Sequence, residues 1–320
     1  MGTGTTGTEK ASPGTGTVLA FDVGGTDIKS GIVLTSNEIV GLERSRTPRD
    51  SSNPGEAILA VIAQLTARYR AGYPELPFTA VGFIVPGLVD EGAGIGILSS
   101  NLGWRDFPFA ARARSLLNAP VAFGHDVGAA GEAEFRSGAA KDSDDAIVII
   151  NGTGIAAAVF CDGRRVKGGG YAGELGHALV PDPEDPQRTA MLESVGSAGA
   201  IAARYSRASG VEVEGSRDVL RRARSGDKAA QRVWDQAIDA LAFSITQCVC
   251  ILGTETVVIG GGISRAGEAL LGPLRQAVDD RLTLPKRHRI VPALLGENAG
   301  LLGAALKARR LLDQGPGDLP

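Results

Sequence analysis

The feature that most constrains the fold is a strand, a glycine-rich turn and a returning strand, an arrangement that occurs twice. The first copy covers residues 18–34 and the second covers residues 146–160. In each copy two apolar runs flank a turn of Gly and Thr, which predicts a hairpin and not the start of a helix. A repeated hairpin followed each time by further strands and helices predicts two similar α/β halves.

Strand-length apolar runs alternate with helical stripes along the rest of the chain. An Asn-Pro-x-Glu start at Asn53 is typical of a helix N-terminus and precedes a stripe that ends at Tyr69. The other predicted strands are Val81–Val85, Val121–Phe123, Thr256–Ile259 and Ile290–Leu295, and the other predicted helices are Val127–Phe135, Trp234–Leu252 and Leu301–Leu312.

Composition excludes several classes of protein. The formal charge of −3 argues against a nucleic-acid partner, and no apolar run is long enough to predict a membrane partner. Three cysteines cannot build a disulfide framework, and together with the lack of a secretory signal they predict a cytoplasmic protein. Residues 1–17 are rich in Gly and Thr, which predicts a disordered tail.

Three glycine-rich turns follow predicted strands, at residues 24–26, 152–154 and 260–262. Backbone amides approach a phosphate closely where side chains are absent. The first turn also has the Asp22 carboxylate before it, which could hold Mg²⁺ directly or through water, and the Lys29 cation after it. None of the turns has the sequence of a Walker A loop, and each could be a simple tight turn.

Asp126 is a candidate general base because it follows a strand and starts a helix, where open α/β sheets bind ligands. A helix N-cap is the alternative role for the same residue. Glu174 and His177 lie in a glycine-rich stretch and could pair with hydroxyl groups of a ligand. A surface acid and a core histidine are the alternatives for these two.

Taken together, these motifs resemble the ROK family of sugar kinases and repressors, within the superfamily of actin, Hsp70 and hexokinase. The resemblance spans residues 18 to 312, nearly the whole chain. It is carried by Asp22–Lys29, Pro86-Gly87, Asn101–Trp104, His125-Asp126, Asn151–Gly154, Gly173–His177 and Gly260–Gly262.

The resemblance implies an α/β fold with two similar actin/hexokinase-like, ribonuclease H-like domains and an interdomain cleft. The expected domains are residues 18–124 with 302–316, and residues 125–301. ATP and Mg²⁺ are the implied cofactors, and a homodimer is the implied assembly. The implied nucleotide contacts are Asp22, Gly24, Gly25, Thr26, Lys29, Gly152, Thr153, Gly154, Gly261 and Gly262, and the implied sugar contacts are Gly87, Asn101, His125, Asp126, Glu174, His177 and Glu193.

Two departures from the family pattern concern substrate and metal. The family usually has Asn immediately before the catalytic Asp, whereas this chain has His125. Many members carry a cysteine cluster that binds zinc after the Glu-x-Gly-His element, whereas residues 178–192 contain no cysteine. The carboxylates in that segment would not replace thiolates, so we expect no zinc.

The function expected from the resemblance is phosphorylation of a hexose at its 6-hydroxyl by ATP, with Asp126 as the base. Glucose is the default sugar, and kanosamine, N-acetylmannosamine and N-acetylglucosamine are alternatives. A sugar-sensing protein without catalysis is a second class, disfavoured because few residues precede the first glycine turn. Inorganic polyphosphate is an alternative donor that would need a basic groove, and no long run of Lys and Arg marks one.

Overall fold

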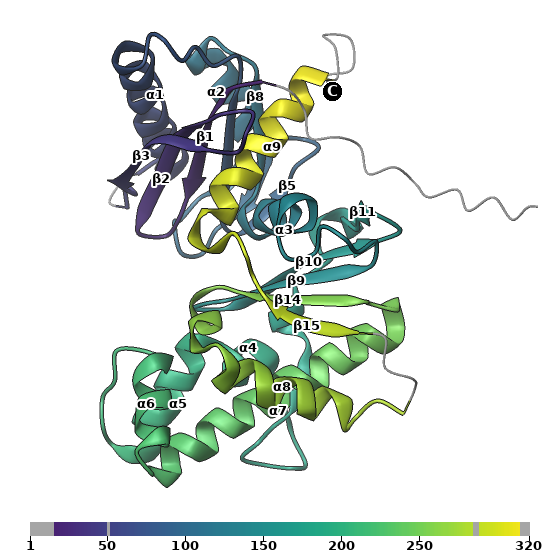
Figure 1. Ribbon diagram of the computed structural model, residues 1–320. Helices are drawn as coiled ribbons and strands as arrows, with labels where there is room; N and C mark the ends of the chain where they lie inside the picture. The colour runs from purple at the N-terminus through teal and green to yellow at the C-terminus, as the bar shows by residue number, and fades with distance from the viewer. Residues whose placement is uncertain (1–15, 50–51, 284–287, 314–320) are drawn as a thin grey trace, which may run out of the picture. The chain divides into compact units, whose positions relative to one another are not determined.

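The computed structural model describes residues 16–49, 52–283 and 288–313. The contacts within the chain divide it into two compact units, with breaks after residues 136 and 296 (Figure 1). Unit 1 contains the described residues up to 136 and those from 297, and unit 2 contains residues 137–296. Most of the predicted tail (residues 1–15) and residues 314–316 lie outside the described ranges.

The sheet of unit 1 has the strand order β3-β2-β1-β4-β8. The strands are β1 (Val18–Val23), β2 (Asp27–Val33), β3 (Ile39–Arg46), β4 (Val81–Val85) and β8 (Val121–His125). β1, β2 and β3 pair antiparallel, whereas β4 runs parallel to both β1 and β8. The carboxyl ends of β1, β4 and β8 therefore meet at one edge of the sheet.

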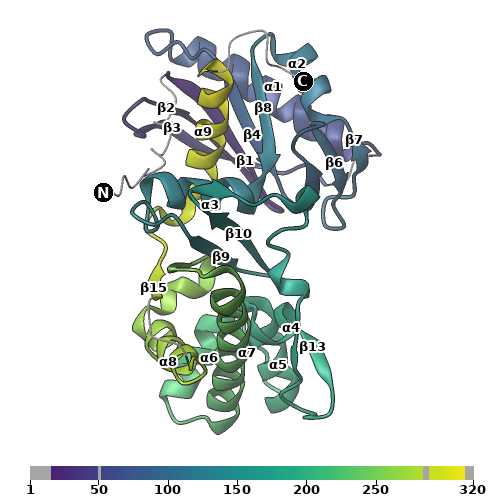
Figure 2. The same cartoon turned by 90° about the vertical axis from the view of Figure 1, so that its right-hand side faces the viewer.

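Helices cover both faces of this sheet (Figures 1 and 2). They are α1 (Pro54–Gly72), α2 (Phe109–Leu117), α3 (Asp126–Ser137) and α9 (Ala299–Asp313). Side chains alternate along β1, so that Phe21 faces the core shared with α1 and α2, and Ala20 faces the core shared with α3 and α9. The α3–α9 contact is close: a Cβ on Gly303 would lie 2.1 Å from the Ala129 carbonyl oxygen.

The units divide after residues 136 and 296, whereas the expected domain boundaries were after residues 124 and 301. The contact between α3 and α9 explains the difference. Both α3 and the first turn of α9 pack against the sheet of unit 1. A small three-stranded sheet also belongs to unit 1 and comprises β5 (Leu88–Asp90), β6 (Ile95–Leu98) and β7 (Arg105–Phe107).

The sheet of unit 2 repeats the topology of unit 1, with the order β11-β10-β9-β14-β15. β9 pairs antiparallel with β10 and parallel with β14, as β1 does with β2 and β4. The prediction of two similar α/β halves is thus confirmed. The strands are β9 (Ala146–Asn151), β10 (Ile155–Cys161), β11 (Arg164–Arg165), β14 (Thr256–Gly260) and β15 (Arg289–Pro292).

The core of unit 2 is built around α7 (Lys228–Leu252). Asp227 caps this helix by accepting hydrogen bonds from the Ala229 and Ala230 amides, and Gly253 ends it in the left-handed conformation. α7 is long and apolar enough to span a bilayer, a property that core helices of soluble proteins share. The other helices are α4 (Leu192–Gly196), α5 (Ala198–Ser209), α6 (Ser216–Arg224) and α8 (Glu268–Asp279), with short 3₁₀ turns at Gly168–Gly170 (η1), Leu175–His177 (η2), Gly262–Ala266 (η3) and Gly296–Asn298 (η4).

Several predicted elements differ in extent from the observed ones. The second strand was expected from Gly31, but β2 begins at Asp27, so the first glycine turn is only three residues long. The last strand was expected to reach Leu295, but β15 ends at Pro292, with one further bond from the Ala293 amide to the Ile259 carbonyl. The helix after Asn53 forms as predicted, with the Asn53 side chain accepting from the Glu56 amide.

Candidate active site

The parallel strands of unit 1 bring several predicted site residues to one edge. In the sheet register, Asp22 of β1 pairs with Ile84 of β4, and Ile84 pairs with Gly124 of β8. Asp22 and Asp126 therefore lie at the carboxyl ends of strands separated by one strand. Gly87, just beyond β4, has a φ of +97°, and a Cβ there would lie 2.4 Å from the Leu98 carbonyl oxygen.

The first glycine turn is fixed by its own backbone and by one neighbouring segment. The Gly24 amide donates to the Asp27 carbonyl at 2.9 Å. The Thr47 hydroxyl donates to the Gly24 carbonyl at 2.7 Å, and the Thr47 amide donates to the Thr26 carbonyl. Thr47 follows β3, a strand that was not predicted, so its role could not be anticipated.

Asn101 lies directly against this turn. A Cβ on Gly25 would be 2.6 Å from Asn101 Nδ2, so only glycine leaves room for the amide. A predicted sugar contact and a predicted phosphate contact therefore touch each other within unit 1. This is the proximity that transfer from a phosphate donor to a sugar hydroxyl requires.

Asp22 has an unusual electrostatic environment. Burial and, to a lesser degree, the Asp126 carboxylate raise its pKa to about 6, against the opposing effects of Lys29 and Arg44. A Cβ on Gly300 would lie 2.5 Å from Asp22 Oδ2, so the N-terminus of α9 leaves space for the carboxylate only because glycine is there. Oxygen ligands of this kind suit Mg²⁺.

Lys29 does not belong to the turn itself. It lies within β2 opposite Asp22 and is 7% exposed. Its ammonium group donates to the Glu297 carbonyl, just before α9, and burial lowers its pKa. In this conformation the Lys29 charge acts on the Asp22 carboxylate.

Asp126 is the first residue of α3, and His125 precedes the helix. The Val127 amide donates to Asp126 Oδ1 at 2.6 Å. The Gly128 amide donates to His125 Nδ1 at 3.3 Å, which is the N-cap contact of this helix. His125 thus supplies the N-cap contact of α3, and the Asp126 carboxylate accepts from the amide that follows it.

The second glycine turn, between β9 and β10 in unit 2, is held by the buried Asn151 side chain. Asn151 Nδ2 donates to the Gly196 carbonyl, and Asn151 Oδ1 accepts from the Ala198 amide, both at 2.9 Å. The Gly152 amide donates to the Gly154 carbonyl across the turn. These contacts tie the turn to the junction of α4 and α5.

The third glycine turn lies against the second. Gly261 has a φ of +79°, and a Cβ there would be 2.2 Å from the Asn151 carbonyl oxygen. Gly262, by contrast, has no atom within 4 Å of the position of its missing Cβ. Unit 2 therefore places two of the three glycine turns side by side, because β9 and β14 are parallel neighbours.

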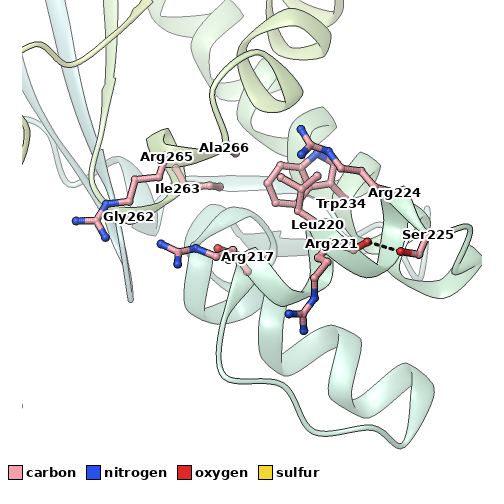
Figure 3. A pocket seen from close by; sticks show the side chains of 11 residues that line it. Arg217, Leu220, Arg221, Arg224, Ser225, Trp234, Gly262, Ile263, Arg265 and Ala266 are labelled. Carbon is pink, nitrogen blue, oxygen red and sulfur yellow. Dashed lines mark hydrogen bonds between the residues drawn. The ribbon is translucent and has the colours of Figure 1, made fainter.

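A cavity of about 440 Å³ opens beside the third turn, between α6, α7 and η3 (Figure 3). Its apolar lining comes from Leu220, Trp234, Ile263 and Ala266, and four arginines surround it: Arg217, Arg221, Arg224 and Arg265. Arg217 and Arg265 extend toward the same side, near Gly262, in Figure 3. None of the described residues that line the cavity is acidic, so the cavity suits a flat apolar group attached to an anion.

Three further predicted sugar residues lie in unit 2. Glu193 Oε2 accepts weakly from the Ile155 amide at 3.4 Å and lies 2.8 Å from the position of a Cβ on Gly154. It therefore lies directly beside the second glycine turn. His177 Nε2 and Glu174 Oε2 are 4.0 Å apart, and the His177 side chain is 64% exposed, so His177 is not the core histidine considered as an alternative.

The segment between His177 and Glu193 forms a hairpin of β12 (Leu179–Pro181) and β13 (Thr189–Met191). Arg204 of α5, 6% exposed, donates to Gln236 Oε1 at 2.6 Å and lies 3.7 Å from Glu184 in the hairpin. Gln236 in turn donates to the Pro183 carbonyl at 3.3 Å. Within the described part of the chain, no group of three or more His, Cys, Asp or Glu side chains is arranged to hold a metal ion.

Comparison with known proteins decides the family. The sequence profile described as "ROK family" matches residues 18–310 of the chain. The chain belongs to the ROK family. It is 31% identical to the glucokinase of Thermotoga maritima, over 90% of this chain and 96% of that protein. It is 30% identical to the N-acetylmannosamine kinase of Yersinia pseudotuberculosis, over 92% and 99% of the two chains.

Solved ROK structures agree in fold. The ROK hexokinase of Thermus thermophilus superposes with a TM-score of 0.81 at 28% identity, covering 93% of this chain and all of that one. The ROK glucokinase of Streptomyces griseus, solved in complex with glucose and AMPPNP, superposes with a TM-score of 0.75 at 26% identity, covering 92% and 99%. The chain is thus a sugar kinase of the ROK family.

Proposed function

We propose that this ROK kinase transfers the γ-phosphoryl group of ATP to the 6-hydroxyl of a hexose, with Asp126 as the general base. The observation that carries the proposal is the position of Asp126 at the N-terminus of α3, close enough to Asp22 to influence its ionisation. The positive end of the helix favours an ionised carboxylate there. Family membership supports the same reaction.

In the transfer step, Asp126 takes the proton of the sugar hydroxyl as that oxygen attacks the γ-phosphorus. A bond forms between the hydroxyl oxygen and phosphorus, and the bond to the β,γ-bridging oxygen breaks. The electron pair of the broken bond leaves with ADP. The backbone amides of the glycine turns donate to the phosphate oxygens and stabilise their charge.

The nucleotide contacts we propose are those of the three glycine turns. The cavity beside Gly262 offers apolar walls for a base and arginines for its phosphates, which supports this placement. Asp22 would hold Mg²⁺, directly or through water, because it lies near the end of the strand that leads into the first turn. When bound, Mg²⁺ neutralises phosphate charge.

For the sugar we propose contacts from Gly87, Asn101, Asp126, Glu174, His177 and Glu193. His125 holds the position that the resemblance also assigns to the sugar. Glucose is the first candidate, and N-acetylmannosamine is the second because relatives with either name are about equally identical to this chain. Kanosamine and N-acetylglucosamine remain candidates because His125 replaces the amide usual at its position. We further propose a cytoplasmic homodimer.

Inorganic polyphosphate is a second candidate donor. The arginines at 217, 221 and 224 are spaced to share one side of α6, and Arg265 joins them at the cavity. These arginines do not form a continuous run in the sequence. A search for runs of Lys and Arg therefore does not find them. Four arginines at one cavity, of which Arg221 is paired with Asp218 at 2.7 Å, would attract a phosphate chain.

The test is a coupled assay with the purified protein, Mg²⁺, and either ATP or polyphosphate as donor. The ATP arm measures ADP release, and the polyphosphate arm measures sugar phosphate. The acceptors are glucose, mannose, kanosamine, glucosamine, N-acetylglucosamine and N-acetylmannosamine. Turnover on one sugar identifies the acceptor and donor. Sugar binding by calorimetry without turnover on any donor would contradict the kinase proposal and favour a sensor.

A further inference from the structure

His125 contacts two groups at once through its two ring nitrogens. Nδ1 accepts a hydrogen bond from the Gly128 amide at 3.3 Å. Nε2 lies 3.1 Å from Asp126 Oδ1. Because an amide N–H always donates, Nδ1 must be the unprotonated nitrogen in this arrangement. The ring proton is then on Nε2, the nitrogen that lies beside the carboxylate.

The orientation of the imidazole is supported from its backbone. The His125 amide donates to Glu91 Oε1 at 3.0 Å, and Lys307 Nζ of α9 lies 3.0 Å from the same oxygen. Both side chains are largely buried, with exposed fractions of 14% for Glu91 and 12% for Lys307. Lys307 passes the strand where Gly124 has no side chain, since a Cβ there would be 2.3 Å from Lys307 Cε.

Asp126 Oδ1 lies within reach of two donors. It accepts from the Val127 amide at 2.6 Å and lies 3.1 Å from His125 Nε2. Two donors on one carboxylate oxygen fix the plane of the carboxylate and thus the direction of the other oxygen, Oδ2. A base held in a fixed direction accepts a proton from a bound hydroxyl more efficiently than one that rotates.

We propose that His125 is a positioning residue for Asp126: Nδ1 of its neutral ring caps α3, and Nε2 holds the carboxylate of the base. The imidazole keeps its proton throughout, and Oδ2 takes the proton of the sugar hydroxyl. The inference rests on the proposed role of Asp126. It differs from the sugar contact that the resemblance assigns to this position.

Three substitutions of His125 separate the contact made by Nδ1 from the contact made by Nε2. In His125→Asn, the amide oxygen can replace Nδ1 as the cap of α3, but nothing reaches Asp126. In His125→Gln, the amide nitrogen can replace Nε2 as donor to Asp126, but the cap is lost. His125→Ala removes both contacts. For each variant we would measure kcat, sugar KM and melting temperature with the best sugar.

The proposal predicts that kcat falls about 10- to 100-fold in His125→Ala and His125→Asn and recovers most of that loss in His125→Gln. Melting temperature should follow a different order, with His125→Asn at the wild-type value and the other two variants lower by about 2–4 °C. A role in folding alone would instead make kcat follow melting temperature, with His125→Asn the most active variant. That result would overturn the proposal.

A sugar contact would give a third pattern, in which KM rises in His125→Ala and is restored in His125→Asn while kcat is unchanged. That pattern would also overturn the positioning role. Asp126→Asn is measured in the same assay: if it keeps wild-type kcat, the base assignment itself fails. If Asp126→Asn is inactive, adding His125→Ala to it should lower the residual rate no further, because the two residues act as one unit.

Discussion

Asp22, near the end of β1, and Asp126, just beyond β8, lie close enough for the Asp126 carboxylate to raise the pKa of Asp22. Burial has the larger effect, and together they bring the Asp22 pKa to about 6. A carboxylate that is costly to ionise in the free protein is suited to a site that receives a cation. The arrangement implies that stability is given up to keep Asp22 in place.

This cost predicts that Asp22→Asn stabilises the ligand-free protein at pH 8. The folded pKa of about 6 exceeds the unfolded value of 3.8, so ionisation of Asp22 destabilises the fold as pH rises from about 4 to 6. The shift corresponds to at most about 3 kcal/mol. Denaturant unfolding should show a gain at pH 8 that vanishes at pH 4. Asp27→Asn, across the same turn, is the control, and equal gains at both pH values would contradict the account.

Gly300→Ala should impair catalysis while leaving the fold intact. Its Cβ would lie 2.5 Å from Asp22 Oδ2 and would displace the carboxylate. We expect kcat/KM for the nucleotide to fall at least about 10-fold, with a melting temperature near that of the wild type. Gly272→Ala in α8, where a Cβ has 3.6 Å of clearance, is the control. Equal activity of the two variants would show that Asp22 need not be where the structure places it.

Neighbouring glycines of the third turn should differ sharply in their tolerance of alanine. Gly261→Ala combines a positive φ with a Cβ 2.2 Å from the Asn151 carbonyl oxygen, whereas Gly262→Ala meets no atom within 4 Å. We expect Gly261→Ala to destabilise the protein by about 2 kcal/mol or more and to weaken nucleotide binding measured by calorimetry. Gly262→Ala should unfold like the wild type. Similar losses in both variants would contradict the packing of the two turns.

Zinc should be unnecessary for the hairpin of β12 and β13. Arg204, Gln236 and Glu184 connect this hairpin to α5 and α7, in place of a metal. Elemental analysis should find far less than one zinc per chain. EDTA treatment followed by Mg²⁺ should restore full activity and leave the melting temperature unchanged. Stoichiometric zinc, or a lower melting temperature after EDTA, would refute this expectation.

Much of the fold could be predicted because its signals are local. The apolar runs of β1, β4, β9 and β14 are continuous in sequence, so these strands form where they were expected. The helix predicted from Trp234 to Leu252 also forms, but α7 begins earlier, at Lys228. β3 (Ile39–Arg46) was not predicted, because it lies at the edge of its sheet and carries charged side chains on one face. Because β3 was not predicted, the contact of Thr47 with the first glycine turn was not predicted either.

The site depends on contacts that local patterns do not encode. The proximity of Asn101 to Gly25 follows from how the small sheet packs in unit 1, and no spacing in the sequence predicts it. Whether Asp126 or His125 caps α3 depends on two neighbouring side chains whose sequence supports either role. The arginines around the cavity, in contrast, could have been found from their helical spacing at 217, 221 and 224.

The most direct test of the account compares kcat of the wild type and Asp126→Asn on the best sugar, with binding of that sugar measured by calorimetry. Asp280→Asn, an exposed carboxylate at the end of α8, is the control. The account predicts a loss in kcat of at least about 1,000-fold in Asp126→Asn, with sugar affinity within about 5-fold of the wild type. A kcat within 10-fold of the wild type would contradict the assignment of Asp126 as the base.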